Sequence, residues 1–299
     1  MFDTSPQLDC AGRILKLDRP RVMGIVNVTP DSFSDGGAHD TLEAAVAHGL
    51  RLAEEGADIL DIGGESTRPG ADEVPVDEEL RRVIPVIERL ACETTLPISI
   101  DTSKPGVMRA AVEAGAGMVN DVYALRREGA LDAAAELGVP VVLVHMLGEP
   151  RSMQDAPEYD DVVGEVHRFL AERIFVAEMA GIAKKRIVVD PGFGFGKATP
   201  HNLQLLAQLE RFTELGVPVL AGLSRKRTIG ELTGRSDPRE RLHGSVAAHV
   251  IAAQRGAGIV RVHDVAATVD ALKVWQAVAT VPLPRKAADA PAIRWPDEI

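Results

Sequence analysis

The stretch that decides the fold is Val22–Gly37, VMGIVNVTPDSFSDGG, in which an apolar, β-branched run gives way to a polar, glycine-rich break. The same succession occurs eight times along the chain, and each break leads into a helical pattern. Because the runs are short and apolar along their length, they are typical of strands that are covered on both faces. The runs are Val22–Val28, Asp58–Ile62, Pro97–Asp101, Met118–Val122, Val139–His145, Arg186–Asp190, Val217–Gly222 and Ile259–His263.

Eight strands that alternate with helices predict an α/β protein whose parallel sheet closes into a single-domain (β/α)8 TIM barrel. An open, doubly wound sheet is the alternative. No GxGxxG motif follows the first run, which disfavours a dinucleotide-binding sheet of that kind. We expect the barrel to span residues 22–281, between an N-terminal segment of residues 1–21 and a loosely ordered, Pro- and Ala-rich tail of residues 282–299.

Helix signals fill the intervals between the runs. Asp40 and Glu43, three residues apart, form a capping box ahead of an apolar stripe. Asp77 and Glu78 open the next helical pattern. Pro85 lies inside that pattern, so we expect a kink or an early break of the helix there.

Composition narrows the classes of function. Aromatic residues make up only 4% of the 299 residues, so Val, Ile, Leu and Ala must fill the core. The two cysteines, Cys10 and Cys92, lack the spacing of metal ligands and indicate a reduced, cytoplasmic protein. No signal peptide or membrane-spanning run is visible, so we expect no membrane partner. The net charge of −11 argues against nucleic-acid binding, and an anionic ligand would need a local cluster of cations.

Polar side chains stand at the carboxyl ends of nearly all the runs. In (β/α)8 barrels this end of the strands carries the catalytic face. A single residue of this kind often only caps the next helix, but a whole ring of them predicts a site. The ring consists of Asn27, Asp61, Asp101, Asn120, Asp121, His145, Asp190, Ser224–Lys226, Arg261 and His263.

The ring contains two chemical sets. Two carboxylates and an amide can hold a flat heterocycle with amino and lactam groups, because a carboxylate accepts from paired N–H groups and an amide both donates and accepts. Three further side chains are cations or donors that suit phosphate oxygens. The first set is Asp101, Asn120 and Asp190, and the second is Lys226, Arg261 and His263.

Loops beside the runs supply further candidate ligands. Asn27, Ser66, Thr67 and Arg68 can close over ligand oxygens or a hydrated Mg2+. In DPGFGFGK, Asp190–Lys197, three glycines allow close backbone approach and two phenylalanines suggest a stacking wall. The alternative for this stretch is an ordinary glycine-rich turn.

Eight motifs together resemble those of the dihydropteroate synthases, enzymes of the folate pathway. They are NVTPDSFSDGG, GGESTRPG, IDTSK, NDV, HMLGEP, DPGFGFGK, GLSRK and RVHDV, and they occur in that family's order and approximate spacing from about Val22 to Val278. The resemblance implies a (β/α)8 barrel that joins p-aminobenzoate to (7,8-dihydropterin-6-yl)methyl diphosphate and releases pyrophosphate, with Mg2+ as cofactor. It also implies a cytoplasmic homodimer and a sulfonamide target.

The resemblance further implies roles for single residues, position by position. The pterin diphosphate would be bound by Thr67, Asp101, Asn120, Met146, Asp190, Lys226, Arg261 and His263, of which Asp101, Asp190, Lys226, Arg261 and His263 would be catalytic. The p-aminobenzoate would be bound by Arg68, Phe195, Lys226 and Arg227, and Asn27 would help to hold Mg2+. Two departures stand out, since Arg227 replaces the family's common Ser and YALRREGA follows Val122 in place of a Ser-Gly continuation.

The expected chemistry is dissociation of pyrophosphate followed by attack of the aniline nitrogen. Arg261, His263 and Mg2+ would stabilise the departing charge, and no strong general base is required. The stretch TPDSFSDGG after Asn27, with a glycine pair as hinge, is expected to act as a lid that excludes water. Two alternatives stay open: a pterin-dependent methyltransferase barrel, and a catalytically silent pterin-binding paralogue.

Overall fold

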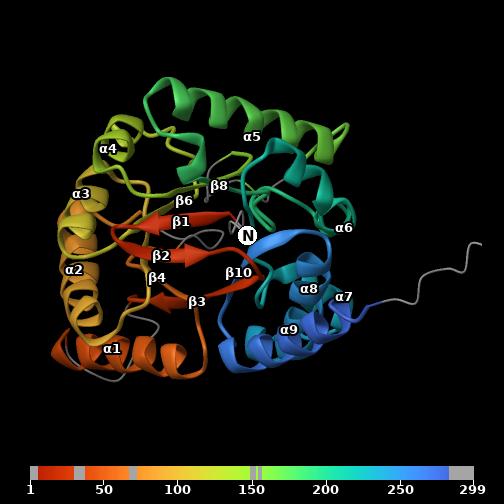
Figure 1. Cartoon of the computed structure of the whole chain (residues 1–299), viewed down its shortest axis with the longest axis horizontal. Helices are drawn as coiled ribbons and strands as arrows, with labels where there is room; N and C mark the ends of the chain where they lie inside the picture. The colour runs from red at the N-terminus through yellow and green to blue at the C-terminus, as the bar shows by residue number, and fades with distance from the viewer. Residues whose placement is uncertain (1–5, 30–37, 67–72, 149–152, 154–156, 283–299) are drawn as a thin grey trace, which may run out of the picture.

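A closed barrel of eight parallel strands forms the centre of the molecule, and helices surround it (Figure 1). The computed structural model describes residues 6–29, 38–66, 73–148, 153 and 157–282. Around the barrel the strand order is β10-β3-β4-β5-β6-β7-β8-β9, and each strand overlaps one of the eight predicted runs, which confirms the TIM barrel. The strands are β3 (Arg21–Asn27), β4 (Ile59–Gly63), β5 (Ile98–Asp101), β6 (Met118–Asp121), β7 (Val141–Val144), β8 (Ile187–Asp190), β9 (Val219–Ala221) and β10 (Ala257–Val262).

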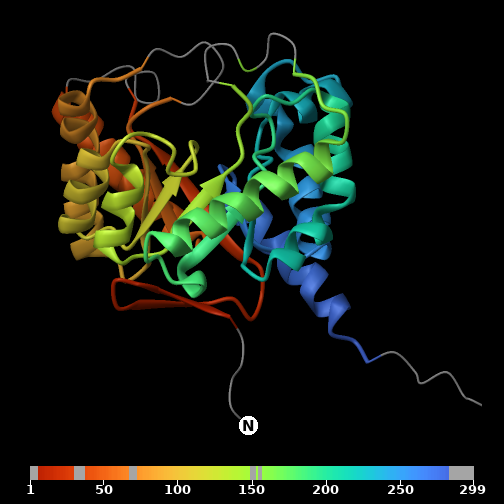
Figure 2. The ribbon, with the colours of Figure 1, turned by 90° about the horizontal axis from the view of Figure 1, so that it is seen from above.

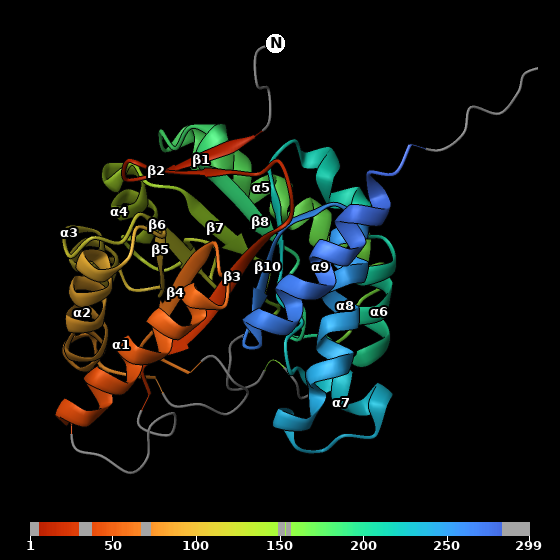
Figure 3. The same ribbon diagram turned by 60° about the horizontal axis from the view of Figure 1, so that its bottom comes forward.

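The helices lie on the outside of the barrel in chain order (Figure 3). The α-helices are α1 (Ala38–Glu54), α2 (Val76–Glu93), α3 (Pro105–Glu113), α4 (Ala130–Leu137), α5 (Val162–Met179), α6 (Thr199–Ala207), α7 (Arg227–Thr233), α8 (Leu242–Gln254) and α9 (Val265–Ala279). The short 3-10 helices are η2 (Lys184–Arg186), η3 (Leu209–Leu215) and η4 (Pro238–Arg241). No helix in the described part of the chain combines the length and the apolar character that a bilayer crossing requires.

Two helix predictions were wrong. Helix α1 begins at Ala38, so position 40 lies within its first turn and not at the expected N-cap position. Helix α2 continues through Pro85 to Glu93 without the expected break. Beyond the proline, Ile87 and Leu90 are completely buried against the core, and this burial outweighs the hydrogen bond that proline cannot donate.

The side chains that point into the barrel form two levels, and these levels position the site. The lower level is one buried apolar cluster of Met23, Ile59, Met118, Val142, Val188, Leu220 and Ile259. Because strand side chains alternate, the next inward residue on each strand lies two positions further on. Most residues of this second level are polar or small: Ile25, Asp61, Asn120, Val144, Asp190, Gly222 and Arg261. The barrel is therefore apolar at its amino end and mainly polar at its carboxyl end.

A two-stranded hairpin lies across the amino end of the barrel (Figure 2). It consists of β1 (Gln7–Cys10) and β2 (Arg13–Lys16), which pair antiparallel within the segment that the sequence left without an assigned structure. Leu8, Cys10 and Leu15 are buried in the same cluster as the lower level of the barrel. The backbone of the hairpin packs closely against the barrel at Gly117, since an added Cβ there would lie 2.4 Å from the Cys10 carbonyl oxygen. The hairpin thus closes the end of the barrel opposite the polar level.

Candidate active site

One cavity at the carboxyl ends of the strands gathers most of the residues that the sequence singled out. It is lined by Ile25, Asp101, Asn120, Val122, Val144, Asp190, Phe195, Gly222, Ser224, Lys226, Arg261 and His263. Asn27, Met146 and Arg227 do not line it, and the Arg227 side chain is 79% exposed and paired with Glu231. The proposed ligands Thr67 and Arg68 lie outside the described residues, as does most of the expected lid, residues 30–37.

A guanidinium links two carboxylates on one side of the cavity. Nε of Arg261 donates to Oδ2 of Asp61 at 2.5 Å, and Nη2 donates to Oδ2 of Asp101 at 2.6 Å. Nδ2 of Asn120 donates to the same Asp61 oxygen at 3.2 Å. Asp61 is therefore the residue that holds Arg261 and Asn120 in a fixed relation. These bonds use two of the five N–H donors of Arg261, so others can reach phosphate oxygens.

Burial changes the pKa of the two carboxylates that line the cavity, Asp101 and Asp190. It raises the pKa of Asp101, against the lowering effect of Arg261. It also raises the pKa of Asp190, against Lys226 and the Gly192 N–H, which donates to Asp190 Oδ1 at 2.7 Å. Burial disfavours the charged form of a carboxylate, and a ligand with paired N–H donors stabilises that charged form.

Lys226 lines the same cavity as these carboxylates and contacts an aromatic ring. Its Nζ is 4.4 Å from the centre of the Phe195 ring and donates to the Phe193 carbonyl. Burial lowers the pKa of Lys226 to about 8, although Asp190 acts in the opposite direction. The side chain therefore still carries a positive charge at neutral pH, next to a ring face that favours cations.

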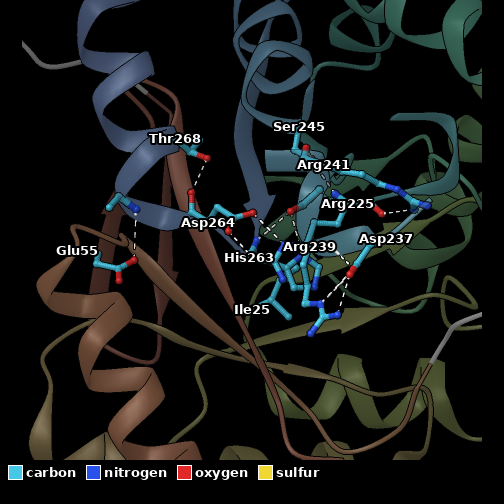
Figure 4. A network of polar contacts seen from close by, with 12 residues as sticks. Ile25, Glu55, Arg225, Asp237, Arg239, Arg241, Ser245, His263, Asp264 and Thr268 are labelled. Atoms are coloured by element: carbon cyan, nitrogen blue, oxygen red, sulfur yellow. Dashed lines mark hydrogen bonds and ion pairs between the residues drawn. The ribbon is translucent and has the colours of Figure 1, made fainter. Parts of the chain in front are cut away.

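A network of polar contacts surrounds His263 at the ends of β9 and β10 (Figure 4). Ser224 Oγ accepts from the His263 backbone N–H at 3.1 Å and lies 2.9 Å from Nδ1 of the ring. Ser224 can donate to Nδ1, and the ring then carries its proton on Nε2, where it can donate to a phosphate oxygen. Arg225, at φ 57°, makes a two-point ion pair with Asp264, at 3.0 and 2.5 Å. The pair joins the loop after β9 to the loop after β10.

The glycine-rich turn of DPGFGFGK is not an ordinary turn. Gly192, Gly194 and Gly196 all have left-handed backbone conformations, with φ of 71°, 80° and 63°. An added Cβ would lie 1.8 Å from the His145 carbonyl oxygen at Gly192 and 2.4 Å from the Leu147 carbonyl oxygen at Gly196. Only glycine allows this close approach, which brings Phe195 to the cavity wall.

These contacts describe a cavity with three parts. Apolar side chains of Ile25, Val122 and Val144 flank it, as suits a flat ring. Carboxylates and an amide can bind the edge of that ring, and Lys226, Arg261 and His263 can bind an anion beside it. The site can therefore hold a heterocycle with an attached phosphate group and stabilise negative charge that leaves it.

The sequence is similar to those of known proteins over nearly the whole barrel. The family described as pterin binding enzyme matches residues 23–263. The dihydropteroate synthase of Escherichia coli K12 is 54% identical over 271 residues, which cover 91% of this chain and 96% of the relative. The chain belongs to the dihydropteroate synthase family.

Solved structures of other dihydropteroate synthases agree with this assignment. The Xanthomonas albilineans enzyme with 4-aminobenzoic acid is 77% identical, has a TM-score of 0.90, and the match covers 93% of this chain and 100% of that one. The same enzyme in complex with 7,8-dihydropteroate matches with 73% identity, a TM-score of 0.86 and the same coverage. The Yersinia pestis enzyme in a sulfonamide drug complex is 49% identical with a TM-score of 0.88, covering 92% of this chain and 100% of that one.

Two residues of this dihydropteroate synthase family member had no role assigned from the sequence. Asp61 was one of many polar strand ends, and only the closed barrel brings Arg261 to it. Lys197 ended the glycine-rich stretch and was read as part of that turn, yet it is buried and has three partners. Strand alternation from Met23 and Ile59 would have identified Asp61 as pointing into the barrel.

Proposed function

We propose that the chain is a dihydropteroate synthase, a transferase that joins p-aminobenzoate to (7,8-dihydropterin-6-yl)methyl diphosphate. The observation that carries this proposal is the cavity that Asp101, Asn120 and Asp190 line together with Lys226, Arg261 and His263. The family membership restricts the heterocycle to a pterin.

The pterin would bind between the apolar side chains, with its polar edge on the carboxylates. Asp101 and Asp190 would accept from the amino and ring N–H groups, while Asn120 would both donate and accept. Met146 is buried next in sequence to His145, and it would support the slot from behind the cavity lining.

The diphosphate would bind the cations and donors that line the same cavity. Arg261 retains donors beyond those that hold Asp61 and Asp101, and Nε2 of His263 can add one more. Lys226 and Thr67 would complete the set. This arrangement favours the charge that develops on the leaving group.

The reaction would begin with cleavage of the C–O bond at the pterin methylene. The bonding electrons leave with pyrophosphate, and the dihydropterin delocalises the resulting cation, which Asp101 and Asp190 stabilise. The lone pair of the aniline nitrogen then forms the C–N bond. The proton on that nitrogen becomes acidic only as the bond forms, so solvent can accept it and no strong base is needed.

The p-aminobenzoate would lie beside Phe195 and Lys226 at the cavity wall. Arg227 begins α7 and is exposed, so it can turn from Glu231 toward the carboxylate of this substrate. Arg68 would contribute from the loop after β4.

Mg2+ would be held mainly by substrate oxygens and water, with Asn27 as a protein ligand. Among the described residues, no group of three or more His, Cys, Asp or Glu side chains could hold a metal ion. Mg2+ needs no such group, because it keeps several waters and takes phosphate oxygens. Asn27 Oδ1 and Asp101 Oδ2 each lie 3.9 Å from the point where a Cβ would stand on Gly63, so oxygen donors face this part of the rim. When bound, the ion would neutralise part of the diphosphate charge.

The protein would act as a cytoplasmic homodimer. Apolar side chains are exposed on three neighbouring outer helices, with exposed fractions of 56% for Leu232 on α7, 41% for Ile251 on α8 and 67% for Val274 on α9. Cys10 and Cys92 are both free thiols, in keeping with a reducing compartment. Sedimentation velocity of the full chain tests the dimer, since a monomer at micromolar concentration would contradict it.

The decisive experiment supplies both substrates with and without Mg2+ and measures dihydropteroate and pyrophosphate together. We expect equimolar products that depend on Mg2+. Binding of the pterin diphosphate without any product would instead identify a silent pterin-binding protein.

A further inference from the structure

Lys197 is a buried lysine that the reaction described above does not use. Its side chain is only 2% exposed. Its Nζ lies 2.9 Å from the carbonyl oxygens of Gly192 and Phe195 and 2.8 Å from Nδ1 of His145. These three partners stand near the start of the glycine-rich turn, near its end, and just after β7.

The contacts hold the turn whether or not the amine is charged. An ammonium has three donors, one for each partner. A neutral amine would donate to the two carbonyls and accept from a proton on Nδ1. Burial lowers the pKa of Lys197, against the effect of Asp190, and burial also lowers the pKa of His145 to about 2, so the imidazole is neutral. In both states the carbonyls of Gly192 and Phe195 are tied to one nitrogen.

The turn that Lys197 holds presents Phe195 to the cavity. The Phe195 ring lines the cavity and faces the Lys226 amine at 4.4 Å. Two further hydrogen bonds hold the same turn, because Tyr159 Oη donates to the Gly196 carbonyl and the Gly194 N–H donates to Asn202 Oδ1, both at 2.8 Å. Glycines occupy three positions of the turn, so apart from the buried Phe193 ring few side chains fix its shape, and the polar contacts matter more.

We propose that Lys197 is a positioning residue that holds the Phe195 ring in the place that p-aminobenzoate requires. The proposal rests on the function proposed above. It predicts that loss of Lys197 affects the aniline substrate far more than the pterin diphosphate, whose ligands Asp101, Asn120 and Arg261 lie on barrel strands. A lysine that merely stabilised the fold would lower the melting temperature without favouring one substrate.

The test compares Lys197→Met with Lys185→Met, which removes an exposed lysine elsewhere on the chain. For each variant of the full chain, kcat and the two KM values are measured with Mg2+ present, and the melting temperature is recorded. We expect Lys197→Met to raise the KM for p-aminobenzoate about tenfold and to leave the KM for the pterin diphosphate within about twofold, because a small misplacement of a binding group is costly. Lys185→Met should match the wild type.

A milder variant covers the case in which Lys197→Met does not fold. Tyr159→Phe removes only the hydroxyl that supports the Gly196 carbonyl, and it should raise the KM for p-aminobenzoate about threefold in the same selective way. Equal changes in both KM values, or none, in the variants that fold would overturn the positioning role. If the wild type itself forms no dihydropteroate, the proposed function fails instead, so the two failures are distinguishable.

Discussion

Replacing Gly192 with alanine should be far more damaging than the same change at a glycine of matched conformation. Gly192 has φ 71° and Gly234, at the end of α7, has φ 69°, so alanine suffers the same backbone strain of about 1 kcal/mol at both. Their surroundings differ completely. An added Cβ at Gly234 meets nothing within 4 Å, whereas at Gly192 it lies 1.8 Å from the His145 carbonyl oxygen.

The clash at Gly192 cannot be relieved by turning a side chain, because the obstructing atom belongs to the backbone. The two groups must separate from 1.8 Å to at least 3.4 Å. That movement disrupts the hydrogen bonds from Gly192 N to Asp190 and from Lys197 to the Gly192 carbonyl. At about 1.5 kcal/mol for each of the two bonds, with the strain of about 1 kcal/mol added, Gly192→Ala should lower the free energy of unfolding by about 4 kcal/mol.

The assay is thermal unfolding followed by circular dichroism, combined with a continuous assay of pyrophosphate release. Gly234→Ala should lower the melting temperature by about 2 °C and Gly192→Ala by about 8 °C. Because Asp190 and Phe195 move with the turn, Gly192→Ala should also lose about 100-fold in kcat/KM while Gly234→Ala keeps its activity. If the two variants lose stability and activity equally, the clash read from the structure is not the cause.

Three further predictions concern the charged groups of the cavity. Asp190→Asn should lower kcat about 100-fold and change pyrophosphate affinity, measured by calorimetry with Mg2+, less than about twofold; equal losses would contradict the division between pterin and phosphate ligands. Arg261→Lys should raise the KM for the pterin diphosphate about tenfold, since lysine cannot bridge Asp61 and Asp101 and still reach a phosphate; an unchanged KM would refute this. Because burial lowers the pKa of Lys226 to about 8, its charge is present below that pH and lost above it, so activity should fall as pH rises through about 8. Lys226→Arg should lack this alkaline limb, and a limb of the same position in both proteins would assign it to another group.

The sequence predicted the barrel because each strand is buried on both faces. A run such as Val139–His145 is apolar up to its final histidine, so its existence was clear, although the strand itself covers only Val141–Val144. The hairpin strands β1 and β2 escaped prediction since each has four residues, of which only alternate side chains are buried in β1. The break expected at Pro85 does not occur for a related reason. Helix propensity is a local property, and it does not include the stabilisation that α2 gains from burial in the folded protein.

The candidate site was predictable in its membership but not in its contacts. Polar residues at strand ends gave Asp101, Asn120 and Asp190, and the structure places all three at one cavity. The bond between Arg261 and Asp61 joins residues 200 positions apart, and it depends on β10 closing next to β3. The role of Lys197 was not predicted because two of its three partners are backbone carbonyls. Every residue has a backbone carbonyl, so the sequence does not show which ones a lysine will contact.

The hairpin at the amino end of the barrel also bears on the order in which the chain folds. Leu8 and Cys10 precede the whole barrel along the chain, yet they are buried against side chains that extend to Ile259. Contacts of such large sequence separation form late, because the intervening chain must first be ordered. The hairpin is therefore among the last elements to be buried, although it precedes the barrel along the chain. Until β10 has joined the sheet, the apolar face of the hairpin stays exposed to solvent and to other nascent chains.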